Sequence, residues 1–224
     1  MTMGAIEELT AYLPMELRFA LSEGDELVGE TDGAALFADV SGFTPMMASL
    51  ATKLGPTRGA EEVTRLLDEL FTTLTTEVHR RHGSLVDFAG DSMLCWFDGA
   101  PRNSTHAPSL SPVDRAAATA VAMRRAMAER RSRSTGDGLE YDLDVKIAVA
   151  SGIANRFVVG DPRIRRMLVL TGRPIDRAAS GEQLARAGEI VCSAEVAAML
   201  SSPVPLREQR ETAAGERYFI FGDT

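Results

Sequence analysis

The chain has 224 residues, 45% of them hydrophobic and 25% charged, which is enough for one large domain with its own core. Its net charge of -8 argues against a nucleic-acid partner, because proteins that bind phosphate backbones usually carry a clustered basic face. No run of residues is long and apolar enough to span a bilayer, and the amino terminus lacks the basic-then-apolar order of a signal peptide. These features predict a cytoplasmic protein with no nucleic-acid or membrane partner.

The two cysteines, Cys95 and Cys192, both lie in apolar, strand-like runs. Thiols in such runs usually serve as small buried hydrophobic side chains. The three histidines show no spacing typical of metal ligands. We therefore expect neither a disulfide nor a zinc site.

Residues 1–32 predict a short helical leader, interrupted at Pro14, and then an acidic connector. A single domain is expected to follow over residues 33–224. The chain shows no internal repeat and no low-complexity tract, so nothing in it predicts a second domain.

The domain opens with an apolar strand at residues 34–40, which runs directly into Asp39. Thr44 is predicted to cap the helix that follows, with Pro45 at its first helical position. A second helix starts near Arg58, because apolar residues recur there at intervals of three and four. The first helix therefore begins immediately beyond the aspartate.

A hairpin at 84–97 that turns at Gly90 and Asp91 is predicted next, followed by a helix at 113–131 and a second hairpin at 141–161 that turns near 151–154. Three further strands are predicted at 167–172, 189–193 and 216–222. Helices are predicted between them at 175–188 and 194–200. This order predicts an α/β fold, an antiparallel-rich sandwich of the ferredoxin-like, split βαβ type with helices packed on the sheet.

Two aspartates, Asp39 and Asp91, interrupt apolar strands 52 positions apart (91 minus 39). In a split βαβ fold the first strand and the hairpin lie side by side, so these carboxylates become neighbours. Paired carboxylates need a cation between them, and oxygen ligands favour magnesium or manganese. The backbone amides of Gly42, Phe43 and Thr44 stand at a helix N-terminus, which favours phosphate. Together these features predict a site for a metal ion and a triphosphate.

Simpler interpretations of the two aspartates also exist. Asp39 can cap the next helix, and Asp91 can act only as a turn former after Gly90. The stretch "LFADVSG" also allows a phospho-acceptor aspartate of a receiver domain, although that interpretation leaves the second hairpin unexplained.

The pair of motifs "FADVSGFT" and "FAGDSMLCWF" resembles the class III nucleotidyl cyclases. Catalytic domains of that family carry a strand that ends in Asp before x-x-Gly-Phe-Thr, and a Gly-Asp hairpin about fifty residues later. The resemblance covers about residues 34–200. The segments "RGAEEV" and "VKIAVASG" are most similar to the soluble, bicarbonate-responsive adenylyl cyclases and their bacterial relatives.

The resemblance implies a dimer with nucleotide sites at its interface and two Mg²⁺ or Mn²⁺ ions in each site. The ions would be held by Asp39, Asp91 and the carbonyl of Val40, and Lys146 would contact the terminal phosphates. The alternative for Lys146 is a strand residue whose ammonium lies in solvent. By the same resemblance the other phosphate contacts are Ser41, Gly42, Phe43 and Thr44. The implied reaction converts a nucleoside triphosphate into a 3′,5′-cyclic nucleotide and pyrophosphate. ATP is the default substrate, and GTP is the alternative, because the carboxylate of Asp87 can accept hydrogen bonds from guanine.

Four positions depart from the family pattern. Asp87 replaces a lysine and Val169 an aspartate, and both of those family residues read adenine. Asp176 replaces the asparagine that orients the ribose, and Ser180 replaces the arginine that stabilises the transition state. Losing that guanidinium is expected to cost a factor on the order of 10³ in rate.

The departures lead to two hypotheses. In the first, the chain is the metal-binding half of a cyclase dimer, weak or inactive as a homodimer, which borrows the missing residues from another cyclase domain. In the second, it is a pseudo-cyclase, a nucleotide-sensing or dimerisation module without turnover. Retention of both aspartates favours the first hypothesis.

Overall fold

The structure is a computed structural model of the 224-residue chain, and it describes residues 29–99, 109–131, 143–161, 166–202 and 204–222. The predicted leader lies outside these residues and stays a prediction. The strand that opens the sheet begins at Gly29, so the last four residues of the predicted connector are part of the folded domain.

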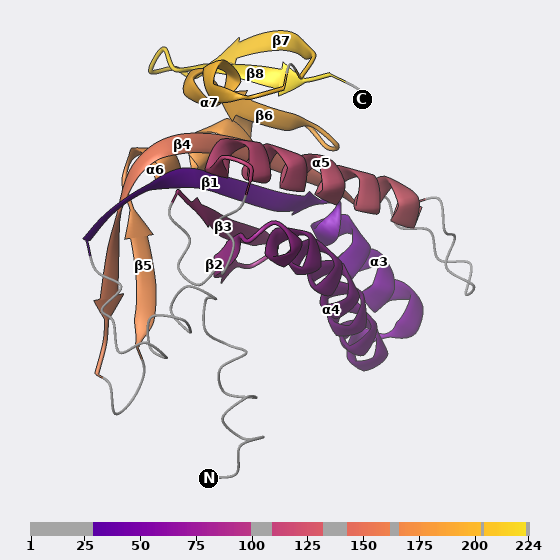
Figure 1. Cartoon of the computed structure of the whole chain (residues 1–224). Helices are drawn as coiled ribbons and strands as arrows, with labels where there is room; N and C mark the ends of the chain where they lie inside the picture. Colours follow the sequence, from indigo (N-terminus) through magenta and orange to yellow (C-terminus); the bar gives the residue numbers. More distant parts are fainter. Residues whose placement is uncertain (1–28, 100–108, 132–142, 162–165, 203, 223–224) are drawn as a thin grey trace.

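A single mixed sheet forms the centre of the molecule (Figure 1). Its first half has the order β2-β3-β1-β4 with every neighbouring pair antiparallel, which is the predicted split βαβ arrangement. These strands are β1 (Gly29–Ser41), β2 (Ser84–Ala89), β3 (Ser92–Asp98) and β4 (Asp144–Val159).

The second half of the sheet extends from β4 in the order β6-β8-β7, while β5 pairs with the far end of β4. The pairing of β4 with β6 is parallel, and the pairings beyond it are antiparallel. These strands are β5 (Met167–Thr171), β6 (Ile190–Ser193), β7 (Leu206–Glu211) and β8 (Arg217–Phe221). The strand β7 is polar after Leu206 and exposed except at Arg210, and it was not predicted.

Helices cover both faces of the sheet because β1 alternates between two cores. Leu36, Ala38 and Val40 pack with apolar residues of three helices on one face, namely α3 (Phe43–Leu54), α4 (Pro56–Arg80) and α5 (Pro112–Arg131). Ala35 points to the other face, where α6 (Arg173–Leu184) packs. A short helix, α7 (Ala194–Met199), follows β6. Both cysteines are free and buried, as predicted.

The predicted hairpin at residues 141–161 is wrong, because one continuous strand, β4, runs from Asp144 to Val159. The Ser151-Gly152 pair that indicated a turn lies inside the strand. There Gly152 is paired with Gly33 of β1, and the pairing with β1 continues on both sides of it, from Gly29 to Ser41. Within the described residues, no helix is both long and apolar enough to cross a membrane.

Candidate active site

Asp39 lies at the end of β1, where the strand is paired with β3 on one side and β4 on the other. Its partner on β3 is Ser92, whose hydroxyl donates a hydrogen bond of 2.7 Å to Asp39 Oδ1. Its partner on β4 is Lys146. The carboxylate therefore lies in a central strand with a polar neighbour on each side, and its side chain is only 18% exposed.

Asp91 occupies the turn between β2 and β3, directly after Gly90 and before Ser92. The backbone N–H of Val40 donates a hydrogen bond of 3.1 Å to the carbonyl oxygen of Asp91. The fold thus brings Asp91 next to the end of β1, as the sequence predicted. Val40 itself is buried in the first core, so its backbone is held firmly at this point.

The chain turns from β1 into α3 over very few residues. The helix is capped by Gly42, which has a left-handed backbone with φ of 88°, a conformation that favours glycine. The predicted cap at Thr44 is wrong, because Thr44 is the second residue of α3 and Pro45 the third. No side chain caps this end. The first amides of α3, including those of Phe43 and Thr44, therefore begin four residues after Asp39 in the chain, at the positive end of the helix dipole.

Lys146 lies on β4 directly opposite Asp39, and its ammonium is 2.8 Å from Asp39 Oδ2. The same ammonium is paired with the carboxylate of Glu182. Burial lowers the pKa of Lys146, but the hydrogen bonds to Asp39 and Glu182 outweigh burial, so the pKa lies above its ordinary value. The alternative of a lysine with its ammonium free in solvent is therefore wrong.

Glu182 reaches this group because α6 packs very closely on the sheet. A Cβ atom at Gly181 would lie 2.7 Å from the ring of Tyr218 and 3.2 Å from Cβ of Ala148, so a glycine is required at that contact. The sequence did not indicate Glu182 as a site residue. Its contact with Lys146 spans 36 positions and depends on packing between a helix and a strand, which no local pattern predicts.

The donor atoms gathered here suit a hard divalent cation. Carboxylates and backbone carbonyls are the ligands that magnesium and manganese prefer. A cation, the ammonium of Lys146, already lies against Asp39. The buried hydroxyl of Ser41, two residues beyond Asp39, has no hydrogen-bond partner among the described residues, which is typical of a group that a ligand satisfies. Nowhere in the described part of the chain do three Asp, Glu, His or Cys side chains form a ligand cluster, so two carboxylates need backbone oxygens to complete a site.

The four departing positions lie on β2, β5 and α6. Asp87 is exposed on β2, and its carboxylate accepts a hydrogen bond of 2.9 Å from the N–H of Phe88. Val169 is half-buried on β5 and pairs with Phe157. Asp176 is exposed in the first turn of α6, and Ser180 is half-buried one turn later.

Arg177, the residue after Asp176 on α6, carries a guanidinium that is paired with two carboxylates. It pairs with Glu195 at 2.6 Å and with Glu216 at 3.1 Å. These contacts hold its side chain against α7 and the start of β8. In this arrangement the guanidinium of Arg177 is shared between two carboxylates.

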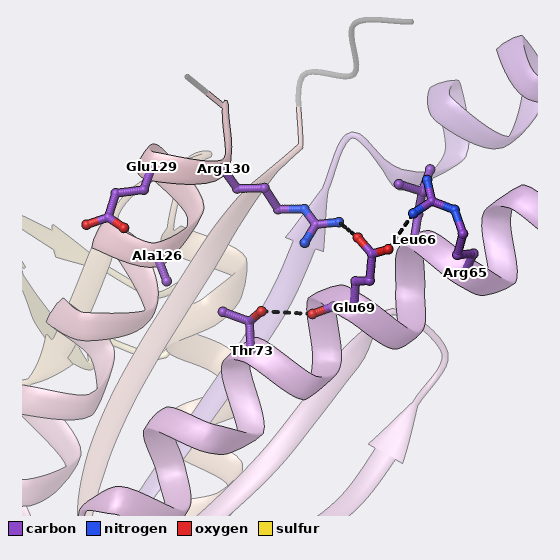
Figure 2. A pocket seen from close by; sticks show the side chains of 7 residues that line it. All are labelled: Arg65, Leu66, Glu69, Thr73, Ala126, Glu129 and Arg130. Atoms are coloured by element: carbon purple, nitrogen blue, oxygen red, sulfur yellow. Dashed lines mark hydrogen bonds and ion pairs between the residues drawn. The ribbon is translucent and has the colours of Figure 1, made fainter. Parts of the chain in front are cut away.

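A cleft of about 350 Å³ lies between α4 and α5 and contains none of the predicted site residues (Figure 2). Glu69 is at its centre and pairs with both Arg65 and Arg130. Arg65 also pairs with Glu62, so the two guanidinium groups are matched by two carboxylates, and the cleft has no unbalanced charge to attract an anion. It is a surface feature separate from the candidate site.

Solved structures show what this fold is. The adenylyl cyclase CyaB from P. aeruginosa matches with a TM-score of 0.71 and 20% identity, over 87% of this chain and 95% of that chain. The guanylyl cyclase Cya2 matches with a TM-score of 0.69 and 21% identity, over 87% and 93%. A bacterial light-regulated adenylyl cyclase matches with a TM-score of 0.76 and 16% identity, over 97% and 60%. The chain has the fold of a class III nucleotidyl cyclase domain.

Residues 30–223 match the family described as the adenylate and guanylate cyclase catalytic domain, and the chain belongs to this family. Adenylate cyclase type 10 of Oryctolagus cuniculus is 25% identical over 191 residues, which cover 84% of this chain and 11% of that protein. An uncharacterized protein of Mycobacterium tuberculosis is 30% identical over 167 residues, which cover 73% of this chain and 26% of that protein. The chain thus spans between about a tenth and a quarter of the length of these relatives.

Proposed function

We propose that this chain is the metal-binding half of a nucleotidyl cyclase dimer and that it binds a metal complex of a nucleoside triphosphate, ATP by default. The observation that carries the proposal is the convergence at one sheet position of Asp39, the Asp91 turn, Lys146 and the start of α3, which no side chain caps. This combination supplies oxygen ligands for cations and both an ammonium and backbone amides for phosphate.

The proposed reaction joins the ribose 3′-oxygen to the α-phosphorus and breaks the bond from that phosphorus to pyrophosphate, while the hydroxyl proton leaves to solvent. Asp39, Asp91 and the Val40 carbonyl would hold two Mg²⁺ or Mn²⁺ ions, which when bound activate the hydroxyl and neutralise the triphosphate. Ser41 and the first amides of α3 would orient the phosphates. Lys146 would bind the terminal phosphates, and its charge would favour the departure of pyrophosphate.

The proposal places the remaining functions on a partner domain. Asp87 and Asp176 would bring further negative charge to a homodimeric site, and Ser180 supplies no guanidinium. A homodimer is therefore expected to be slow, and a different cyclase domain that carries the missing lysine, aspartate, asparagine and arginine would complete the site.

The exposed apolar surface of the strand pair β4 and β5 supports this proposal. Four large apolar side chains on these strands are 43–58% exposed, namely Ile153, Phe157, Val159 and Met167. The two strands form an arm that extends away from α3 and α4 (Figure 1). Exposed apolar side chains gathered on one projection are typical of a protein interface.

A second candidate function is a pseudo-cyclase that binds nucleotide without turnover. The observation that favours it is the loss of all four partner-side residues, since the kept aspartates and Lys146 can serve binding alone.

One experiment separates these functions. The purified chain is assayed with Mn²⁺ and each of the four ribonucleoside triphosphates, alone and with a cyclase domain that carries the missing residues, and both cyclic nucleotide and nucleotide binding are measured. We expect slow or absent turnover alone and clear turnover in the mixture. Binding without turnover in either case would favour the pseudo-cyclase, and absence of nucleotide binding would exclude both.

A further inference from the structure

The ammonium of Lys146 bridges two carboxylates from different elements. It lies 2.8 Å from Asp39 Oδ2 on β1 and also pairs with Glu182 on α6. The exposed fractions of the three side chains are 25% for Lys146, 18% for Asp39 and 12% for Glu182, so the group is largely withdrawn from water. Two negative charges share a single positive charge here, which leaves room for one more cation.

We infer that Glu182 is a positioning residue, which holds Lys146 ready for phosphate when a divalent cation replaces the ammonium at Asp39. The inference rests on the proposed function, because it assumes that Asp39 binds that cation. It assigns to Glu182 a role that Asp39, Asp91 and the phosphate-binding residues do not cover.

The charge balance of the group makes this role necessary. A divalent cation and an ammonium repel each other, so Lys146 leaves Asp39 when the cation binds there. Without Glu182, the ammonium that leaves Asp39 would be largely buried with no carboxylate partner, which carries a large free-energy cost. Glu182 removes this cost, because the ammonium keeps one carboxylate partner throughout the exchange. Lys146 can then turn toward phosphate from a fixed anchor and with little loss of side-chain freedom.

The placement of Glu182 fits an anchor rather than a metal ligand. It reaches the group from α6, on the face of the sheet opposite to α3. Asp39 contacts Lys146 from the neighbouring strand, whereas Glu182 contacts it from the helix that packs on the sheet. The cation and the anchor therefore approach Lys146 from different elements, and one can change without displacing the other.

The test is a double-mutant cycle on the binding of Mn²⁺ alone, measured by the spin-resonance signal of free Mn²⁺. Four proteins are compared: the unmodified chain, Glu182→Gln, Lys146→Met and the double variant. We expect Glu182→Gln to weaken Mn²⁺ binding when Lys146 is present, because the ammonium then depends on Asp39 alone. In the Lys146→Met background, the factor by which Glu182→Gln weakens Mn²⁺ binding should be smaller by at least about threefold. A coupling of this size is typical of residues in contact.

Each outcome has a defined meaning. Equal effects of Glu182→Gln with and without Lys146 would overturn the inference, because Glu182 would then act on the cation directly. Absence of Mn²⁺ binding by the unmodified chain, or binding that survives Asp39→Asn, would instead contradict the proposed function. Glu211→Gln on the outer strand β7 removes the same charge at an exposed position and should leave Mn²⁺ binding unchanged. Thermal unfolding of each variant without metal shows that it is folded.

Discussion

Asp39 is neutralised within its own chain, because it accepts a hydrogen bond from Ser92 and pairs with Lys146. This arrangement changes the expected effect of its removal. If the carboxylates of Asp39 and Asp91 only repelled each other, Asp39→Ala would stabilise the protein without ligand. The observed contacts predict instead that this variant loses about 1 kcal/mol of stability. The ammonium keeps Glu182 as a partner, which limits the loss.

For the liganded protein, we expect Asp39→Ala to abolish the rise in melting temperature caused by Mn²⁺ with ATP, since a ligand stabilises only the state that binds it. Thermal unfolding with and without Mn²⁺-ATP measures this effect. The matched control is Asp68→Ala on α4, where the aspartate is exposed and outside the site. A full ligand-induced shift in Asp39→Ala would show that the nucleotide does not bind where we place it.

Hydrogen bonds to the carboxylate of Asp114 connect the start of α5 to the segment after α7. This carboxylate accepts hydrogen bonds from the N–H and hydroxyl of Ser201, at 2.9 and 2.6 Å, and from the hydroxyl of Ser111. Burial raises the pKa of Asp114, but these hydrogen bonds outweigh it and hold the pKa below its ordinary value of 3.8. The carboxylate therefore stabilises the fold above that value, and the contribution is lost as the pH falls through the pKa of the folded state.

Asp114→Ala is expected to lower the free energy of unfolding by about 1–2 kcal/mol at pH 7. The difference from the unmodified chain should shrink as the pH falls below about 3.8, because the unmodified chain then loses the same charge. Urea unfolding at several pH values measures the difference, with Asp68→Ala as a control that should show little effect at any pH. A difference that stays constant down to pH 3 would mean that packing rather than charge carries the contribution.

Elements in which apolar residues recur at regular intervals could be predicted from the sequence. Elements that depend on pairing between strands could not. The helix α4 follows from apolar residues such as Leu66 and Leu70, which recur on one face and are buried. In contrast, β4 looked like a hairpin because a Ser-Gly pair is a local turn signal, and only its long pairing with β1 keeps it straight. The strand β7 carries no apolar alternation and forms because β8 offers an edge.

The same division holds for the candidate site. Asp39 and Asp91 could be identified because each interrupts an apolar strand. Glu182 could not, since its contact with Lys146 depends on how closely α6 packs on β4. Local sequence thus indicates residues that break a pattern, whereas partners that arise from packing become visible only in three dimensions.

The arm formed by β4 and β5 predicts how the whole molecule associates. Phe157 is 44% exposed there, among other exposed apolar side chains. We expect Phe157→Asp to weaken self-association at least about tenfold, because a charge buried in an apolar interface is costly. Sedimentation velocity over a range of concentrations measures this. Leu206→Asp on β7 introduces the same charge at a side chain that is 40% exposed and should leave association unchanged. A chain that is monomeric at every concentration, with or without nucleotide, would contradict a site shared between two copies.

A dimer of identical chains would place α6 of one copy toward the nucleotide of the other, according to the family resemblance. Asp176 and Ser180 lie four residues apart on α6, so they project from one face of the helix and would act on the same nucleotide. Arg177 lies on a different face and is held by Glu195 and Glu216. The missing guanidinium therefore has to be restored at position 180 itself.

Ser180→Arg combined with Asp176→Asn is expected to raise the Mn²⁺-dependent cyclase rate of the homodimer at least about tenfold, which corresponds to about 1.4 kcal/mol of barrier. The first change supplies positive charge for the transition state, and the second removes negative charge from the ribose pocket while it keeps a hydrogen-bonding group. Because both act on one transition state, the double variant should gain more than the product of the single gains. Ala60→Arg, an exposed position on α4, adds the same guanidinium outside the site and should change nothing. If the folded, dimeric double variant is no faster than the unmodified chain, α6 does not face the nucleotide as the family geometry implies, and the pseudo-cyclase becomes the better description.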